Sequence, residues 1–173
     1  MSPKKVLYFG NEDIARNGFP LSVDPYKIIP RGGNCFDFDS EGVHGFIRKR
    51  VEFKQLQENH FIVGFGDLMD NYGVDDVVES NNGDIVRIFS TIIRVIEDFM
   101  RKHPQATLYF TGSTMQRTRI YSVILNRHFA RFRKKFQISV LWTCGGVDVK
   151  VPFDPAKEVL MGTFVIQSKN QTT

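Results

Sequence analysis

The feature that most constrains the fold is a run of apolar residues between positions 85 and 100 that repeats at intervals of three and four. This spacing places apolar side chains on one face of an α-helix. The run consists of Ile85, Ile88, Phe89, Ile92, Ile93, Ile96, Phe99 and Met100. Asp84 stands where an N-cap is expected, and Pro104 ends the helix soon after a basic last turn. The pattern predicts a helix that buries one face against another layer.

Short apolar segments on both sides of this helix predict strands. In chain order the predicted elements are strands at 44–54 and 61–65, the first helix, a strand at 106–111, a second helix at 114–133, and strands at 136–142 and near 159–167. A polar link of hairpin length joins the first two strands, so we expect them to pair antiparallel. Prolines and the turn-forming segment 31–34 predict little regular structure over residues 1–40.

Helix and strand alternate only in the second half of the chain, which predicts the α+β class. We expect a single mixed, largely antiparallel sheet with two main helices on one face and at least one right-handed βαβ crossover. A chain of 173 residues is predicted to form one domain, 1–173, with a loop-rich N-terminal segment at 1–34 and a core at 35–169.

Composition excludes several classes of protein. A hydrophobic content of 42% with 24% charged residues is typical of globular proteins and excludes disordered and fibrous chains. The apolar run 6–9 is too short for a signal-peptide core or a membrane span. Cys35 and Cys144 lie far apart and form no C-x-x-C pair, which argues against a disulfide framework or a thiolate zinc site. We expect a cytoplasmic protein without cofactors or membrane partners.

Positive charge is concentrated in one segment. Residues 99–147 carry nine Lys and Arg residues and no Asp or Glu, and subtracting these nine charges from the net charge of +4 leaves −5 for the rest. This asymmetry indicates either an acidic partner for the basic segment or internal pairing between the two parts of the chain.

The link between the 106–111 strand and the second helix is a candidate anion-binding site. A strand breaks at a glycine there, and a helix begins with two arginines in its first turns. The candidate residues are Gly112, Ser113, Thr114, Arg117 and Arg119. Free N–H groups at a helix start carry partial positive charge, and a glycine lets a ligand approach the backbone. The alternative is structural, because Ser113 as N-cap with Gln116 three residues later fits a capping box.

Arg117 needs a negative partner. At 100° per residue it falls on the apolar face of the second helix, whereas Arg119 points away from that face. A buried arginine without a partner costs several kcal/mol, so either a bound anion or a carboxylate from Asp67, Asp76 or Asp84 is expected beside Arg117. The spacing of these carboxylates matches no calcium loop or other metal-ligand pattern, and no metal site is predicted.

The known phosphate-handling and catalytic motifs are absent from the sequence. It contains neither a P-loop nor a G-x-G-x-x-G fingerprint. A nucleotidyltransferase needs paired carboxylates close after its Gly-Ser element, whereas the first acidic residue after Ser113 is Asp148. None of the four histidines falls in a triad motif, and His128 is interpreted as a core histidine.

A second basic cluster closes the second helix: Arg127, Arg131, Arg133, Lys134 and Lys135. Cations at a helix C-terminus are favoured by the helix dipole, which explains several of them. The same side chains could contact a nucleic-acid backbone, although no base-reading motif accompanies them.

Several short motifs are spread along the chain: Ser40-Glu41-Gly42 with Gly45, Phe65-Gly66-Asp67, Asp75-Asp76, Asn82-Gly83-Asp84, Gly112-Ser113-Thr114 with Arg117-Thr118-Arg119 and Tyr121, and Pro152-Phe153 before Phe164. Together they resemble an uncharacterised bacterial family whose domain has no known function. The resemblance spans residues 35–169, and its most specific part is the Gly-Ser-Thr and Arg-Thr-Arg run. It implies a small, soluble, bacterial protein of the cytosol and supplies no reaction, cofactor or partner.

We therefore expect a binding or regulatory module that recognises a phosphorylated or otherwise anionic ligand or partner at the start of the second helix. One alternative is a hydrolase or transferase acting on a phosphate-containing small molecule, with Asp67, Asp76 or Asp84 as acid–base groups. The other is a protein-interaction or nucleic-acid-backbone-binding protein without a small ligand. The sequence does not predict an oligomeric state.

Overall fold

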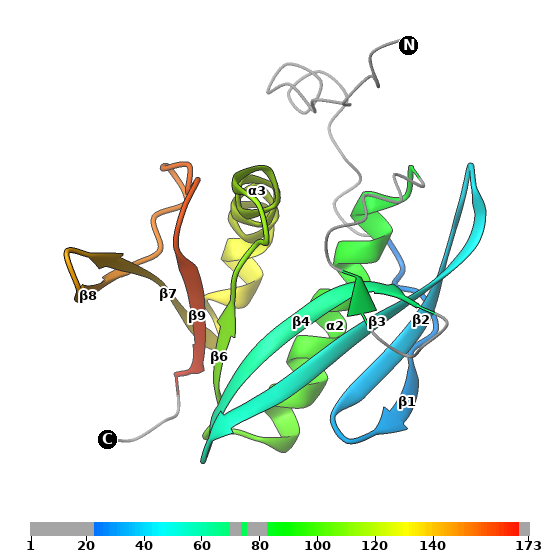
Figure 1. Ribbon diagram of the computed structural model, residues 1–173, viewed down its shortest axis with the longest axis horizontal. Helices are drawn as coiled ribbons and strands as arrows, with labels where there is room; N and C mark the ends of the chain where they lie inside the picture. The colour runs from blue at the N-terminus through cyan, green and yellow to red at the C-terminus, as the bar shows by residue number, and fades with distance from the viewer. Residues whose placement is uncertain (1–22, 70–73, 76–82, 170–173) are drawn as a thin grey trace, which may run out of the picture.

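The structure is a computed structural model that describes residues 23–69, 74–75 and 83–169 (Figure 1). Its elements, in chain order, are β1 (Ile29–Gly32), β2 (Cys35–Gly42), β3 (Gly45–Gln57), β4 (His60–Leu68), β5 (Val74–Asp75), α2 (Ile85–Lys102), β6 (Thr107–Phe110), α3 (Met115–Phe132), β7 (Phe136–Cys144), β8 (Val147–Pro152) and β9 (Thr163–Ser168).

The strands form one mixed sheet in the order β1-β2-β3-β4-β6-β9-β7-β8, and β5 pairs with β4 off this path. All of the pairings are antiparallel except that between β4 and β6. Helix α2 makes the crossover between these two parallel strands. The predicted α+β class and mixed, largely antiparallel sheet are confirmed.

Both helices pack on the same face of the sheet. On α2, the Phe99 ring stacks on Phe53 of β3 with centroids 3.8 Å apart. On α3, the Tyr121 ring lies 4.5 Å from Phe110 of β6 and 5.6 Å from Phe89 of α2. The strand register puts the β3, β4 and β6 residues that meet these rings on one side of the pleat. One core therefore lies between the sheet and the two helices, as the helical pattern predicted.

A buried ion pair joins β3 and β4 on the face of the sheet that is turned to this core. The ammonium group of Lys49 donates to Asp67, which lies directly opposite in the register, and the two side chains are 4% and 13% exposed. The Lys49 ammonium also lies 5.9 Å from the centre of the Phe65 ring. A charge pair on the apolar face of a strand requires both partners, because either one alone would be buried without compensation.

The opposite face of β2 and β3 carries a ladder of charges. The Asp37 carboxylate is 1% exposed and accepts hydrogen bonds from Arg50 at 2.7 and 3.0 Å and from Arg31 at 3.0 Å. Burial raises the pKa of the Asp37 carboxyl, but the hydrogen bonds and charges of Arg50 and Arg31 outweigh burial and hold that pKa below its ordinary value. Arg48 forms a two-point ion pair with Asp39 beside it.

The prediction of little regular structure over residues 1–40 is wrong for residues 29–40, because β1 and most of β2 lie there, whereas residues 1–22 lie outside the described residues. In β2, the apolar side chain of Phe38 faces the core while Asp37 faces away, which is the alternation of a strand. Pro30 is compatible with β1 because that strand is at the edge of the sheet.

Strand β8 was not predicted either. It pairs with β7 across the two-residue turn Gly145–Gly146, whose φ angles of 58° and 78° both lie in the left-handed region. Tight hairpin turns of this kind favour glycine. The β7–β8 hairpin is thus encoded by two glycines between alternating segments.

Candidate functional site

Thr114 caps helix α3. Its backbone is extended (φ −133°, ψ 160°), and its hydroxyl oxygen accepts a hydrogen bond from the Arg117 backbone N–H at 3.2 Å. The proposed capping box, with Ser113 as N-cap and Gln116 as its partner, is therefore wrong by one residue. Ser113 is exposed and precedes the cap. Threonine and serine cap helices by the same hydrogen bond, so the sequence alone allows the helix to begin after either Ser113 or Thr114.

Gly112 is required by packing. A Cβ atom at this position would lie 2.5 Å from the backbone nitrogen of Thr118, 2.7 Å from its Oγ1 and 2.9 Å from the carbonyl carbon of Arg117. The first turn of α3 thus lies directly against the backbone that leaves β6. The glycine serves the close approach of a helix rather than leaving open space for a ligand.

Arg117 reaches back to the start of its own helix. Its Nη1 lies 3.3 Å from Ser113 Oγ, and the side chain is partly exposed. The guanidinium is thereby held beside the first-turn N–H groups, which have no acceptor within the helix. Residues Ser113 to Gln116 are all exposed, and the first turn of α3 contains no acidic residue.

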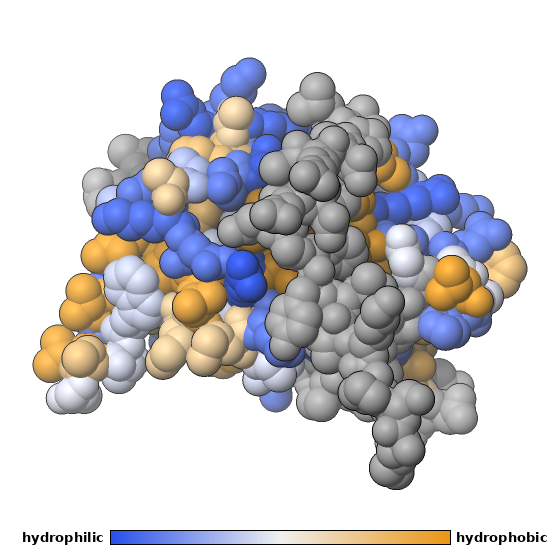
Figure 2. Space-filling model, turned by 90° about the horizontal axis from the view of Figure 1, so that it is seen from above, coloured by the Kyte–Doolittle hydropathy of each residue, from blue (hydrophilic) through white to orange (hydrophobic). Residues whose placement is uncertain are grey.

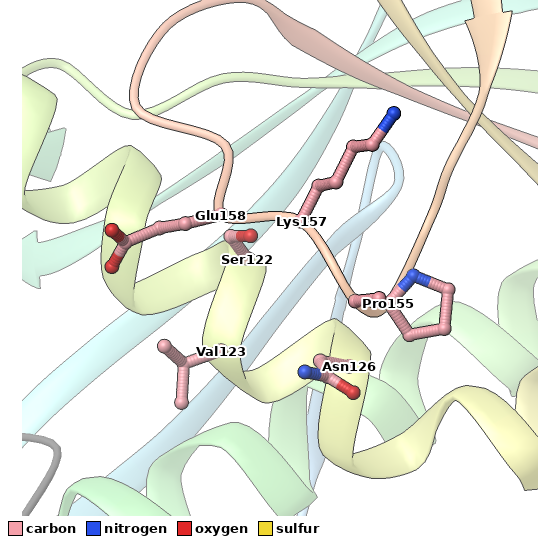
Figure 3. Close-up of a pocket in the computed structure, with 7 residues that line it drawn as sticks. Ser122, Val123, Asn126, Pro155, Lys157 and Glu158 are labelled. Atoms are coloured by element: carbon pink, nitrogen blue, oxygen red, sulfur yellow. The ribbon is translucent and has the colours of Figure 1, made fainter.

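Arg119 points to a different part of the molecule. Its guanidinium forms an ion pair with Glu158, in the segment between β8 and β9. This ion pair borders a pocket of about 200 Å³ between α3 and that segment, lined by Ser122, Val123, Asn126, Pro155, Ala156, Lys157 and Glu158 (Figure 3). The Ser122 hydroxyl oxygen accepts the backbone N–H of Val159 at 3.1 Å, which ties the segment to α3. The structure therefore separates Arg119 from the other predicted site residues.

Two of the three predicted carboxylate partners of Arg117, Asp67 and Asp84, have other contacts. Asp67 accepts the Lys49 ammonium, and Asp84 Oδ2 accepts the hydroxyls of Tyr26 and Ser40, each at 2.6 Å. Within the described residues neither carboxylate forms an ion pair with Arg117. Asp76 lies outside the described residues.

Asp84 occupies the N-cap position of α2 but makes no capping hydrogen bond with its side chain. It anchors the segment before β1 to β2 and α2 instead, through Tyr26 and Ser40. Burial and the hydrogen bond to Asp84 raise the pKa of the Tyr26 hydroxyl. The other oxygen, Oδ1, is buried and accepts no hydrogen bond from the described part of the chain. The Arg87 guanidinium covers the Tyr26 ring at 4.0 Å.

Internal pairing accounts for part of the basic segment. Arg131 forms a two-point ion pair with Glu97 of α2, at 2.6 and 3.1 Å, and Arg101 pairs with Asp98. Arg133, Lys134 and Lys135 are exposed. Arg127 lies one turn before Arg131 on α3, and nucleic-acid contacts by this cluster remain a prediction.

His128 is half-buried between these charges, rather than fully enclosed in the core. Burial lowers the pKa of its imidazole, and the nearby Arg131 and Arg127 lower it further.

The described residues form neither a metal site nor a membrane-spanning helix. Among residues 23–69, 74–75 and 83–169, no three His, Cys, Asp or Glu side chains are grouped so that they could hold a metal ion. Neither α2 nor α3, the helices in the described ranges, is long and apolar enough to cross a membrane.

The fold and the site define a small α+β protein with a two-helix layer on one mixed sheet and a basic helix start at the end of β6. A family model described as a family of unknown function (DUF6934) matches residues 23–169, and the chain belongs to this family. Comparison with curated proteins and with solved structures gave no match. The match begins at residue 23, before the predicted core at 35–169, and it includes Tyr26 and β1.

Proposed function

We propose that this protein is a binding module that recognises a phosphate ester or a similar anionic group at the start of α3. The observation that carries the proposal is the position of the Arg117 guanidinium, 3.3 Å from Ser113 Oγ. A full positive charge, a hydroxyl group and the N–H groups of Met115 and Gln116, which have no acceptor within the helix, then belong to one exposed helix start. Charge-assisted hydrogen bonds of this kind are about twice as strong as neutral ones.

The packing of Gly112 supports the proposal indirectly. Because the first turn of α3 lies against the end of β6, the N–H groups that would meet the anion are held by the sheet. A donor set that is fixed before binding loses less conformational entropy when the ligand arrives. Arg119 is paired with Glu158, so the proposal assigns the anion contact to Arg117 rather than to Arg119.

The contacts of Asp67 and Asp84, the two candidate carboxylates in the described part of the chain, favour binding over a reaction. Asp67 is engaged by Lys49, and Oδ2 of Asp84 already accepts two hydroxyl hydrogen bonds. A general base must reach the proton of a substrate. We also propose that the protein is bacterial and cytoplasmic. The bacterial origin rests on the motif resemblance, and the cytoplasmic location rests on that resemblance and on Cys35 and Cys144 being free thiols.

The test is a phosphate titration followed through backbone amide signals. We expect Ser113, Thr114 and Met115 to shift before other residues. Gly112→Val should abolish the response, because a larger side chain displaces the first turn of α3. A uniform response across the surface, or none at millimolar phosphate, would contradict the proposal.

A further inference from the structure

The two edges of the sheet differ in how they are protected. Strand β1 has four residues, contains Pro30 and is interrupted by a register shift. Short, irregular, proline-containing edges resist pairing with other strands. Strand β8 is longer, pairs with β7 in unbroken register, and has its proline at the last position. Its residues are exposed apart from Val151, so β8 presents a regular edge with which no further strand of the described residues pairs.

The hydrogen-bonding direction along β8 follows from its turn. In a two-residue hairpin the closing pair, here Cys144 and Val147, is hydrogen-bonded, and hydrogen-bonded pairs then alternate along the ladder. The backbone groups of Val147 and Val149 therefore point toward β7. Those of Asp148 and Lys150 point away from the sheet, where their N–H and C=O groups can pair with another strand.

We propose that β8 pairs antiparallel with β8 of a second copy of this chain, with Val149 at the two-fold axis. This register places Asp148 directly opposite Lys150 of the second copy, and Lys150 opposite its Asp148. Both are residues whose backbone groups point outward, so the two chains exchange four backbone hydrogen bonds. The sequence Val147-Asp148-Val149-Lys150-Val151 is thus complementary to itself when reversed.

Other registers of the β8–β8 pairing are less favourable. A shift of one residue would oppose outward-pointing with inward-pointing backbone groups. A shift of two residues in one direction places Asp148 opposite itself, and in the other direction places Lys150 opposite itself. Like charges directly across a strand pair are destabilising. In the second case Asp148 would also face Pro152, which has no N–H to donate.

An exposed apolar surface lies beside the same edge. It consists of Trp142, Val147, Val149, Leu160 and Met161, which are 38% to 67% exposed. Figure 2 shows hydrophobic residues gathered at the left, on the side where Figure 1 places the β7–β8 hairpin. The indole of Trp142 is held in place by donating Nε1–H to the Met161 carbonyl at 2.7 Å.

The proposed pairing covers part of this apolar surface. Val149 is opposite Trp142 in the hairpin, so the dimer forms a continuous row of Trp142, Val149 and their copies across four strands. On the other face, Asp148 accepts the Thr143 hydroxyl at 2.6 Å and Lys150 donates to Gln167 at 2.9 Å. These contacts hold both charged side chains on one face of the sheet, where the second copy would meet them.

The first test reverses the charges one at a time. Asp148→Lys places like charges opposite each other twice in the symmetric dimer, and so does Lys150→Asp. Each variant alone should raise the dissociation constant of the dimer about tenfold or more, as measured by sedimentation equilibrium. A mixture of the two variants should restore it as a heterodimer, because every opposed pair is then of opposite charge. Near-ultraviolet circular dichroism confirms that each variant is folded.

The second test reports geometry. Val149→Cys, with native Cys144 changed to Ser, should form a disulfide-linked dimer on mild oxidation. The two introduced thiols would face each other in a non-hydrogen-bonded antiparallel pair, where Cα atoms are about 4.5 Å apart. Val147→Cys in the same background is the matched control and should not self-link, because its opposite residue is Val151. A monomeric full-length protein, charge variants that leave the dimer unchanged, or equal cross-linking of both cysteine variants would overturn the proposal.

Discussion

Gly112 gives the sharpest prediction about how the site is built. In Gly112→Ala the new methyl group would lie 2.5 Å from the Thr118 backbone nitrogen and 2.9 Å from the Arg117 carbonyl carbon. These are backbone atoms of the first helical turn, so relief requires α3 to move as a unit or its first turn to unwind. Overpacking a well-packed position costs about 1–3 kcal/mol, and a clash with backbone belongs at the upper end.

Gly64→Ala is the matched control. Its Cβ would meet the side chain of Glu52 at 3.1 Å, and that flexible side chain can rotate away. We expect a loss of about 3 kcal/mol in the free energy of unfolding for Gly112→Ala and less than about 1 kcal/mol for Gly64→Ala. Urea unfolding with a common slope measures both. Equal stabilities of the two variants would refute the packing role of Gly112.

Three further predictions concern charged and titratable groups. Asp67→Asn should cost about 3 kcal/mol because it leaves Lys49 buried without its charge partner, whereas Asp39→Asn in the exposed pair with Arg48 should cost less than about 1 kcal/mol in the same urea assay. The lowered pKa of His128 means that the folded state favours the neutral imidazole. The contribution of His128 to the free energy of unfolding is therefore present above about pH 6.5 and is lost as the pH falls from there through the folded pKa. His128→Gln should flatten this part of a plot of stability against pH. The lowered pKa of Asp37 gives stability that is present above about pH 3.9 and is lost as the pH falls through the folded pKa, so Asp37→Asn should be less sensitive to acid below pH 4 in thermal melts.

The elements predicted best are those whose apolar pattern is compatible with only one type of secondary structure. The apolar run of the 18-residue helix α2 repeats at intervals of three and four, and only a helix puts those side chains on one face. The antiparallel β3–β4 pair and the strand–helix–strand order that follows were also confirmed. Such patterns are local, so a single sequence contains all of the information that they need.

The missed strands depend on their surroundings. In β1 and β2, prolines and glycines suggested loops, but the alternation of Phe36, Asp37 and Phe38 is that of a strand with one buried face. Asp37 has an outward position and is still almost fully buried, because Arg31 and Arg50 cover it. That burial depends on which strand pairs with which, and no local pattern predicts it.

The candidate site was predicted in part. The strand, the glycine and the helix start lie where the sequence placed them. The cap is one residue later, and Arg119 turns to Glu158, which is 39 residues away in the chain. The Lys49–Asp67 pair and the contacts of Asp84 were not predicted, since they join residues from separate elements. The two glycines Gly145 and Gly146 between alternating segments are a local signal for a hairpin, and this signal could have predicted β8.

Arg117 is proposed to supply the positive charge for an anion at the start of α3. Phosphate affinity and urea unfolding, both measured on Arg117→Ala and on Arg119→Ala, test this role. We expect phosphate affinity to fall about tenfold or more for Arg117→Ala, because a charge-assisted hydrogen bond is lost, and to stay within a few-fold for Arg119→Ala. A large loss of stability in Arg117→Ala with phosphate binding intact would show that Arg117 has a structural role instead.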